Sequence, residues 1–329
     1  MKEEEIRNAD THKQYLEMVC ADALNFFNSP ASVEVVSCPA CTSARFHREF
    51  TKFGFTYVTC DECRTLYVNP RPKVGPLKYF YVRSPSSRFW VEKFFAPVAE
   101  ARRLKIFRPR AAYVAESLPS LAEGTVGDIG AGYGLFLEEL RQFWPRGRLI
   151  AIEPSPEMAK ICRDKQLEVA ESTIEDLNAH DGTFTLLTAF ELLEHLHKPQ
   201  SMVSKAYSLL APGGYFLITT LSGDGFDIQI MWDKSRSIFP PHHLNFLNPD
   251  SLALLCQNAG FAVKSIETPG ALDWQIVEGA MARRDIQLDR FWSHVNRTSS
   301  ADCKADLQTW ISKHRLSSHM RILVQKPVN

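Results

Sequence analysis

The chain has 329 residues, of which 45% are hydrophobic, and its 38 basic and 38 acidic residues give a formal net charge of zero. A chain of this length can bury a substantial core and suggests about two domains. The neutral balance argues against nucleic acid as a general partner. No apolar run approaches the roughly 18 residues of a membrane span. The acidic N-terminus lacks the apolar core of a secretory signal, so we expect a cytoplasmic protein without a membrane span.

Composition and spacing divide the chain into four parts. We expect an N-terminal helical segment over residues 1–32, a metal-binding module over 33–75, a helical linker over 76–118 and a larger domain over 119–329. Apolar residues at helical spacing support the first segment. Three prolines near the end of the module mark a boundary before the linker.

Two cysteine pairs lie in the module, and Cys38, Cys41, Cys60 and Cys63 form the pattern C-x2-C-x18-C-x2-C. Each short turn can direct two thiolates at one ion, and four thiolates complete the tetrahedral shell of structural zinc. Such a closed site stabilises a module that is too small to fold on its own core. We therefore predict a structural Zn²⁺ at these cysteines, with a redox dithiol or a chance pairing as the alternative.

After the linker, strands and helices alternate. Strands separated by helices of about ten residues indicate crossover connections and a parallel α/β sheet with helices on both faces. The expected strands are 125–129, 148–153, 167–170, 184–189, 215–221, 261–267 and 321–325, and the expected helices are 135–143, 156–165, 200–210 and 250–258.

A glycine-rich segment, Val126-Gly-Asp-Ile-Gly-Ala-Gly-Tyr-Gly134, lies where the first of these strands passes into a helix. Glycines allow a tight turn and close approach of a ligand, and the amides of the following helix favour an anionic group such as a carboxylate. A dinucleotide fingerprint is not met, because Leu135 occupies the sixth position counted from Gly130. The spacing Asp-x-Gly-x-Gly-x-Gly resembles the first motif of class I S-adenosylmethionine-dependent methyltransferases; a merely tight turn is the alternative.

This resemblance covers about residues 110–270 and implies a Rossmann-like methyltransferase sheet that binds S-adenosyl-L-methionine. It implies that the glycine loop surrounds the methionine moiety, that Glu153 binds the ribose and that Thr173 and Ile174 contact the adenine. The short acidic-histidine segment after the fourth strand also matches, although Glu194 and His195 can instead cap and pack a short helix. The cofactor-binding residues implied are Asp128, Gly130, Ala131, Gly132, Gly134, Glu153, Pro154, Thr173, Ile174, Phe190, Glu191 and His195.

A four-cysteine ribbon ahead of such a core also resembles bacterial methyltransferases of nucleotide-linked sugars. In the sugar C-methyltransferases a Tyr-x-Glu-His motif lies downstream, with its histidine proposed as a base. Here Pro240-Pro-His242-His243 stands at those positions, so the histidine is kept as His243 while the tyrosine and glutamate are absent. We predict His243 as a catalytic base, with His242 and His195 behind it; structural hydrogen bonding by these histidines is the alternative.

The histidine pair lies in a long aromatic segment, residues 222–248, between the fifth strand and the next helix. Long insertions at this end of a sheet commonly form binding walls or lids. We predict an acceptor-site insertion, with core packing of its aromatic residues as the alternative.

Together these patterns predict methyl transfer from S-adenosylmethionine to a small molecule, a nucleotide-linked sugar or cell-envelope glycan precursor. An RNA methyltransferase that uses the zinc module for substrate binding is the alternative, and a cofactor-binding protein without catalysis is the third reading. The basic run from Arg102 to Arg110 is interpreted as a solvated helix face, with a phosphate-contacting patch as the alternative. The sequence indicates neither the acceptor nor the methylated atom, and no oligomeric state.

Overall fold

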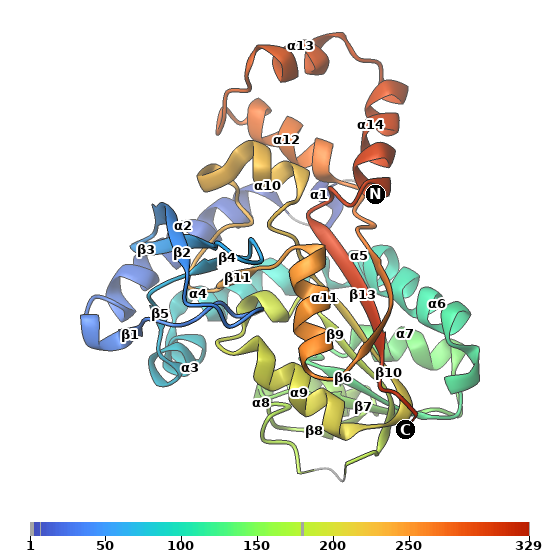
Figure 1. Ribbon diagram of the computed structural model, residues 1–329. Helices are drawn as coiled ribbons and strands as arrows, with labels where there is room; N and C mark the ends of the chain where they lie inside the picture. Colours follow the sequence, from blue (N-terminus) through green and yellow to red (C-terminus); the bar gives the residue numbers. More distant parts are fainter. Residues whose placement is uncertain (1–2, 7, 179–180, 329) are drawn as a thin grey trace.

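The computed structural model describes residues 3–6, 8–178 and 181–328; the other residues of the expected N-terminal segment and of the larger domain lie outside the described chain. A large central sheet is flanked by helices, a smaller sheet lies beside it, and a group of helices projects at one end (Figure 1). Within the described residues, no helix combines the length and the apolar character that crossing a membrane requires.

The central sheet has seven strands in the order β12-β13-β10-β9-β6-β7-β8. Strands β8, β7, β6, β9 and β10 are parallel, whereas β13 is antiparallel to both of its neighbours. From β6 the chain continues to β7 and β8 on one side of the sheet. It then returns to β9, on the other side of β6, and continues from there to β10. The strands are β6 Thr125–Ile129, β7 Arg148–Ile152, β8 Glu168–Ala170, β9 Phe184–Phe190, β10 Leu210–Leu221, β12 Ala262–Glu267 and β13 His319–Gln325.

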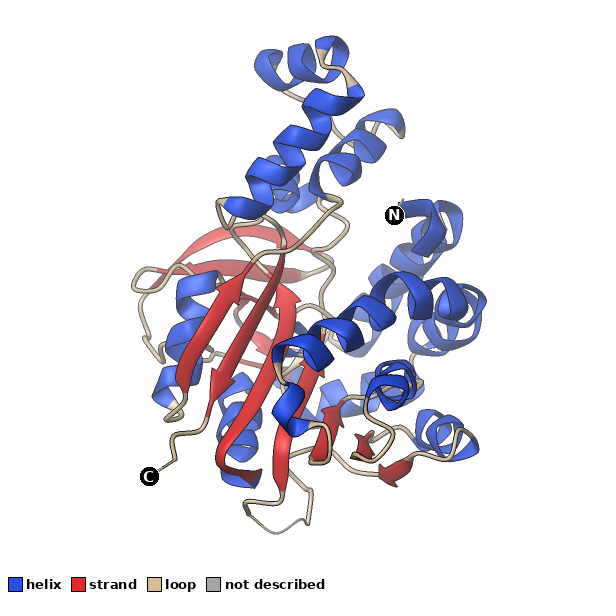
Figure 2. Ribbon diagram, turned by 90° about the vertical axis from the view of Figure 1, so that its right-hand side faces the viewer, coloured by secondary structure: helices blue, strands red, loops and turns tan. Residues whose placement is uncertain are grey.

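Side chains alternate between the two faces of this sheet, and helices cover both (Figure 2). Phe216 and Ile218 of β10 pack with α9 (Pro199–Leu209) and α11 (Pro249–Asn258) on one face. Leu217 faces the opposite way, toward the core that α6 (Arg108–Ser117) and α7 (Leu135–Phe143) form, and α8 (Pro156–Asp164) adds to that layer. This period of two is the pattern that a sheet buried on both faces requires. The α/β sheet with helices on both faces, predicted from the sequence, is therefore confirmed.

Strand β10 begins five residues before the expected start at Tyr215. Leu210 already pairs with Phe184, and the register then shifts before Tyr215 pairs with Leu186. The turn around Gly213, whose φ is +80°, is thus accommodated as an irregularity within one strand.

The cysteine region forms a four-stranded sheet in the order β11-β4-β3-β2. Strands β2 (Phe46–Lys52), β3 (Phe55–Cys60) and β4 (Leu66–Val68) are close in sequence, but β11 (Asn245–Phe246) belongs to the segment 222–248. It pairs antiparallel with β4, and Figure 1 shows the two side by side. The first and last strands of this region, β1 (Val33–Glu34) and β5 (Arg71–Pro72), pair antiparallel with each other as a separate two-stranded sheet. The predicted insertion is therefore joined to the cysteine region by a strand.

Helices from the first third of the chain lie near the carboxyl ends of the parallel strands. The longest, α2, starts after Asn8, whose side chain accepts a hydrogen bond from the Thr11 amide and so caps the helix. The linker is helical but irregular, and two of its turns have π-type hydrogen bonding. These elements are α1 Glu3–Ile6, α2 Ala9–Phe26, η1 Pro30–Ser32, α3 Val74–Arg83, α4 Pro85–Phe89, η2 Trp90–Phe95, η3 Ala96–Val98, α5 Ala99–Arg102, η4 Arg103–Phe107 and η5 Pro119–Leu121.

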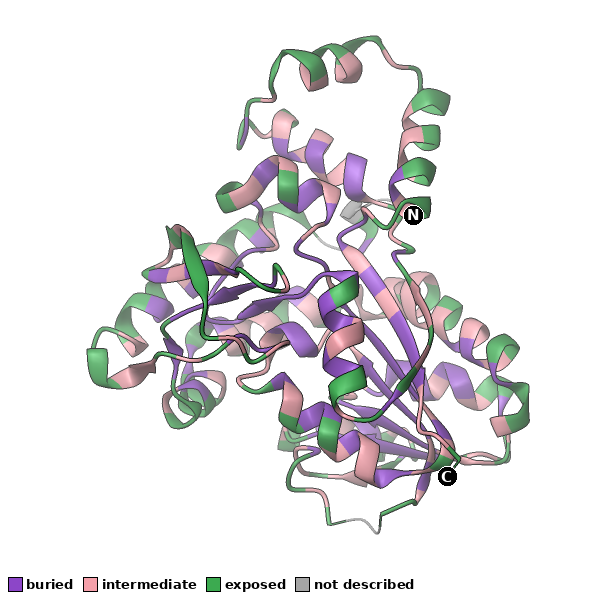
Figure 3. Cartoon of the chain, in the orientation of Figure 1, coloured by how far each residue is buried: buried purple, intermediate pink, exposed green. Residues whose placement is uncertain are grey.

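The projecting group consists of α10 (Phe226–Met231), α12 (Asp273–Ala282), α13 (Arg290–Thr298) and α14 (Ala301–Lys313). Figure 3 shows burial concentrated in the sheets and exposure increasing toward this group. Helix α13 has no buried residue.

Candidate functional site

The glycine-rich segment forms a turn between β6 and α7. Gly130, Gly132 and Gly134 have φ values of +67°, +55° and +67°, in the left-handed region that favours glycine. A Cβ on Gly134 would lie 2.6 Å from Leu167 Cδ1, so this position also needs glycine for packing. A Cβ on Gly132 would meet nothing within 4 Å, so open space lies next to this part of the loop. The loop is thus shaped to let a ligand approach its backbone.

Two carboxylates lie at the ends of the adjacent strands. Asp128 of β6 is buried, and its Oδ1 accepts a 2.6 Å hydrogen bond from Thr188 Oγ1; burial raises the pKa of Asp128 to about 7. Glu153, directly after β7, accepts hydrogen bonds from the amides of Gly132 at 2.7 Å and Ser155 at 2.9 Å. Burial raises the pKa of Glu153 as well. Glu153 therefore contacts the glycine loop directly.

A cavity of about 400 Å³ opens beside the loop. Its walls come from the glycine loop, the end of β9 with η6 (Leu193–His195), the segment 222–248, and the helices α2 to η4. The size is that of a small-molecule site. The predicted residues that line it are Asp128, Gly130, Ala131, Gly132, Phe190, Glu191, His195, His242 and His243.

The remaining predicted cofactor residues, Gly134, Glu153, Pro154, Thr173 and Ile174, do not line this cavity. Gly134 begins α7, and Pro154 is exposed next to Glu153. The Thr173 hydroxyl donates to Asp176 Oδ2 at 2.9 Å, and the Ile174 side chain is buried in the core. Gly134 lies after β6, Pro154 after β7, and Thr173 and Ile174 after β8.

Three histidines meet at the far end of the cavity. The ring of His243 donates from Nδ1 to the carbonyl oxygen of Ser237 at 2.6 Å, and it lies 4.7 Å from the His195 ring, centroid to centroid. His242 is buried, and its Nε2 has no hydrogen-bond partner among the described residues. Burial lowers the pKa of His195 to about 4 and that of His242 well below its usual range. His195 and His242 are therefore neutral near pH 7.

Beside them, Glu191 and Glu194 have different surroundings. Burial alone would raise the pKa of Glu191, but His319 and Arg110 outweigh burial and lower it. Glu194 is 1% exposed and accepts a 2.8 Å hydrogen bond from Thr220 Oγ1. Its burial and the charge of Glu191 raise the pKa of Glu194 to about 8.

Part of the cavity wall was not predicted from the sequence. His12 and Tyr15 of α2, Tyr81 of α3 and Trp90 of η2 also line the cavity. The Tyr133 hydroxyl of the loop itself donates to the Val91 carbonyl oxygen at 3.0 Å. The aromatic content of the linker was the available signal, but its helical spacing did not show which face meets the loop.

Four basic residues of the linker run, Arg103, Lys105, Arg108 and Arg110, form ion pairs. Arg103 and Arg108 both bind the buried carboxylate of Glu139, at 2.6 and 2.7 Å. Arg110 pairs with Glu191 at 2.7 Å on the cavity wall. These arginines therefore attach the linker to the main domain, an arrangement that neither the solvated-face interpretation nor the phosphate-patch alternative described.

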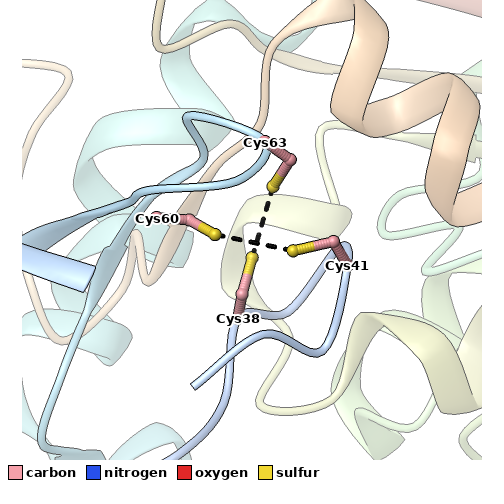
Figure 4. A group of neighbouring side chains, drawn as sticks. All are labelled: Cys38, Cys41, Cys60 and Cys63. Carbon is pink, nitrogen blue, oxygen red and sulfur yellow. Dashed lines mark hydrogen bonds between the residues drawn. The ribbon is translucent and has the colours of Figure 1, made fainter. Parts of the chain in front are cut away.

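The four cysteines of the module point toward one another (Figure 4). The Sγ atoms of Cys38 and Cys63 are 3.5 Å apart, as are those of Cys41 and Cys60. Thiolates on a tetrahedral zinc, with bonds of about 2.3 Å, lie about 3.8 Å apart, whereas a disulfide joins its sulfurs at about 2.05 Å. The cluster consists of free thiols in an arrangement that fits one zinc ion.

The cysteine region also holds the histidine segment in place. The buried hydroxyl of Tyr57 donates to the His243 carbonyl oxygen at 2.6 Å. Arg71, 1% exposed, donates to Asn245 Oδ1 at 3.0 Å. The side-chain Nδ2 of Asn248 donates to the Cys63 carbonyl oxygen at 3.0 Å. The position of His243 thus depends on contacts made by the first 75 residues.

The sequence is similar to those of known methyltransferases. The family model described as "Methyltransferase domain" matches residues 99–266, just over half of the chain. A protein of Xanthomonas euvesicatoria pv. vesicatoria named ubiquinone biosynthesis O-methyltransferase is 29% identical over 170 residues, which cover 48% of this chain and 70% of the relative. A similarly named protein of Xanthomonas axonopodis pv. citri is 29% identical over 158 residues, 44% of this chain and 65% of the relative.

Solved structures are also similar. Phosphoethanolamine N-methyltransferase 2 of Haemonchus contortus, in complex with S-adenosyl-L-methionine, has a TM-score of 0.49 and 17% identity, covering 80% of this chain and 63% of that one. A possible histamine N-methyltransferase of Thermotoga maritima has a TM-score of 0.45 and 20% identity, covering 70% and 95%.

The family match spans the glycine loop, the strand-end carboxylates and the η6 residues that line the cavity. The chain therefore belongs to the methyltransferase-domain family and is a class I S-adenosylmethionine-dependent methyltransferase with a Rossmann-like fold.

Proposed function

We propose that the protein methylates a hydroxyl group of a small polar molecule, a nucleotide-linked sugar or a cell-envelope glycan precursor. The observation that carries this proposal is the cavity, which connects the glycine loop to the histidines. A volume of about 400 Å³ suits a small acceptor next to the cofactor's methyl group. Because the sulfonium methyl is already electrophilic, the enzyme's main task is to position the acceptor and exclude water.

In this proposal S-adenosylmethionine binds along the glycine loop. Its carboxylate binds at the amides of the glycine loop, with Gly132 leaving the necessary space. Glu153 accepts the ribose hydroxyls with oxygens that already face the loop. Thr173 and Ile174, which follow β8, are the adenine contacts in this proposal, and Asp128 lines the cavity beside the loop.

His243 assists removal of the acceptor's proton. Its Nδ1–H is engaged by the Ser237 carbonyl, so the lone pair is on Nε2. The ring is largely buried, with 8% of the residue exposed, and it lines the cavity. His242 is second in this proposal, because it lines the same cavity and its Nε2 has no hydrogen-bond partner within the described part of the chain.

Transfer to oxygen is favoured over transfer to carbon. The Tyr-x-Glu-His pattern of the sugar C-methyltransferases is incomplete here, and the Xanthomonas relatives are named O-methyltransferases. Aromatic side chains such as Trp90 and Phe239 line the cavity and suit the apolar face of a sugar ring. The RNA alternative has less support, because Arg103, Arg108 and Arg110 are paired with carboxylates.

The cysteine cluster holds a structural zinc ion in this proposal. Four thiol ligands leave no open coordination position for a substrate or water. Its role is to stabilise the small sheet that carries β11 and supports His243.

The test is to incubate the protein with S-adenosylmethionine carrying a labelled methyl group and a bacterial extract of small molecules and glycans, and to identify the labelled product. With that acceptor, His243→Asn should lower turnover by about 10²- to 10⁴-fold while cofactor affinity is unchanged. His294→Asn, on the exposed face of α13, is the matched control and should keep full activity. Labelled RNA as the main product, or full activity of His243→Asn, would contradict the proposal.

A further inference from the structure

Glu194, His195 and His243 form a compact cluster on the cavity wall. One ligand-type atom from each residue lies within 4.8 Å of the other two. Two of the residues are neighbours in η6, whereas His243 arrives from the segment 222–248. The cluster is distinct from the four cysteines, the other group of this kind among the described residues.

Both histidines of the cluster have a defined proton. His243 donates its Nδ1–H to the Ser237 carbonyl at 2.6 Å, and the His195 ring is hydrogen-bonded to the backbone of His242. Each imidazole therefore keeps one nitrogen lone pair free of a proton when it is neutral. A ring nitrogen that donates to a backbone carbonyl, with the lone pair of the other nitrogen as the metal ligand, is the usual arrangement of a metal-binding histidine.

The carboxylate of the cluster lacks a cationic partner. Glu194 is buried and accepts one hydrogen bond from Thr220, and the ion pairs of the described residues include none with its carboxylate. Arg110 of the cavity wall, whose charge favours the ionised form of Glu194, is bound to Glu191 instead. A buried carboxylate in such surroundings is costly in its charged form. A bound cation would remove that cost.

We propose that Glu194, His195 and His243 bind one divalent transition-metal cation in the acceptor cavity, and that the acceptor hydroxyl completes its coordination. Two imidazoles and one carboxylate leave coordination positions open, as in catalytic metal sites. Nitrogen and oxygen ligands of a tetrahedral ion lie about 3.4 Å apart, so the cluster would close by at most about 1.5 Å on binding. This inference rests on the proposed function and specifies how His243 assists the loss of the proton.

The chemistry balances without a further reactant. A hydroxyl bound to the cation has a lower pKa, so its proton passes to water at the cavity mouth. The oxygen then forms its bond to the methyl carbon while the carbon–sulfur bond breaks, and S-adenosylhomocysteine is the second product. His243 acts in this step as a ligand that holds the cation.

Mn²⁺ binding to the full-length protein tests this assignment independently of activity. Mn²⁺ prefers carboxylate and imidazole to thiolate ligands, so a protein with zinc at its cysteines should bind one additional Mn²⁺ per chain, measured by loss of the free-ion electron paramagnetic resonance signal. Glu194→Gln and His195→Asn should each weaken this binding at least tenfold. His242→Asn, a buried histidine of the same cavity outside the cluster, is the control and should bind Mn²⁺ like the wild type. Zinc content and S-adenosylmethionine affinity establish that each variant is folded.

The outcomes separate this inference from the proposed function. Absence of Mn²⁺ binding at millimolar concentration, or equal binding by wild type and both cluster variants, would overturn the metal site. A chelator-treated protein that keeps its cysteine zinc and transfers methyl at the full rate would also overturn it, while supporting the proposed function. Normal Mn²⁺ binding with no labelled acceptor from any extract would support the metal site and count against the proposed function.

Discussion

Replacing Tyr57 by phenylalanine tests the coupling between the cysteine region and the cavity. The Tyr57 side chain is completely buried, and its hydroxyl donates to the backbone oxygen of His243 at 2.6 Å. Tyr57→Phe keeps the ring contacts with Phe50 and Phe246 and removes only this hydroxyl. Because a buried carbonyl then loses its donor, we expect the free energy of unfolding to fall by about 1–3 kcal/mol.

Equilibrium urea denaturation, followed by tryptophan fluorescence and by release of zinc to a chromophoric chelator, measures this loss. Tyr79→Phe is the matched control, because that tyrosine is 61% exposed and should tolerate the change. We also expect lower turnover with unchanged cofactor affinity, since the glycine loop is not touched while His243 loses a backbone anchor. Tyr57→Phe with the stability and turnover of the wild type would refute the coupling.

Three further substitutions test other parts of the structure. Gly132→Val should abolish S-adenosylmethionine binding in calorimetry without unfolding the sheet, because its side chain would enter the open space beside the loop at a φ that valine disfavours; unchanged affinity would reject the cofactor position. Cys60→Ser should lower zinc content from about one ion per chain and destabilise the small sheet, whereas a zinc-free wild type would contradict the zinc site. Burial and the neighbouring Asp273 raise the pKa of Asp227 to about 7 from 3.8, so the folded state holds a proton that the unfolded state loses, and stability falls as the pH rises from about 4 to 7. Asp227→Asn should therefore gain up to roughly 4 kcal/mol over the wild type at pH 8 but little at pH 4 in denaturation experiments, and equal gains at both pH values would refute this explanation.

The central sheet and the glycine loop could be predicted because their signals are local. The alternation of buried strands with helices is visible within short windows, and the spacing from Asp128 to Gly134 shows the turn directly. The cysteine spacing is local as well, and the structure brings the four thiols together as predicted.

The rest depends on contacts between distant residues. Strand β11 has only two residues, Asn245 and Phe246, so no period could identify it, and its partner β4 lies in the first quarter of the chain. The cavity wall from α2 depends on how the N-terminal helix packs against α4 and η2, which its helical spacing does not specify. The aromatic residues of the segment 222–248 divide between roles: Phe239 lines the cavity, whereas Phe246 packs with the cysteine region.

The pairing of β4 with β11 has a consequence for synthesis and for engineering of the chain. The ribosome releases the cysteine strands long before Asn245 and Phe246, so β4 has an unpaired edge until most of the methyltransferase domain has emerged. A fragment that ends after the cysteine region would keep that edge open and would tend to self-associate. The cysteine region therefore cannot be exchanged independently of the catalytic domain. Transferring it to a related enzyme would require β11 to be transferred with it.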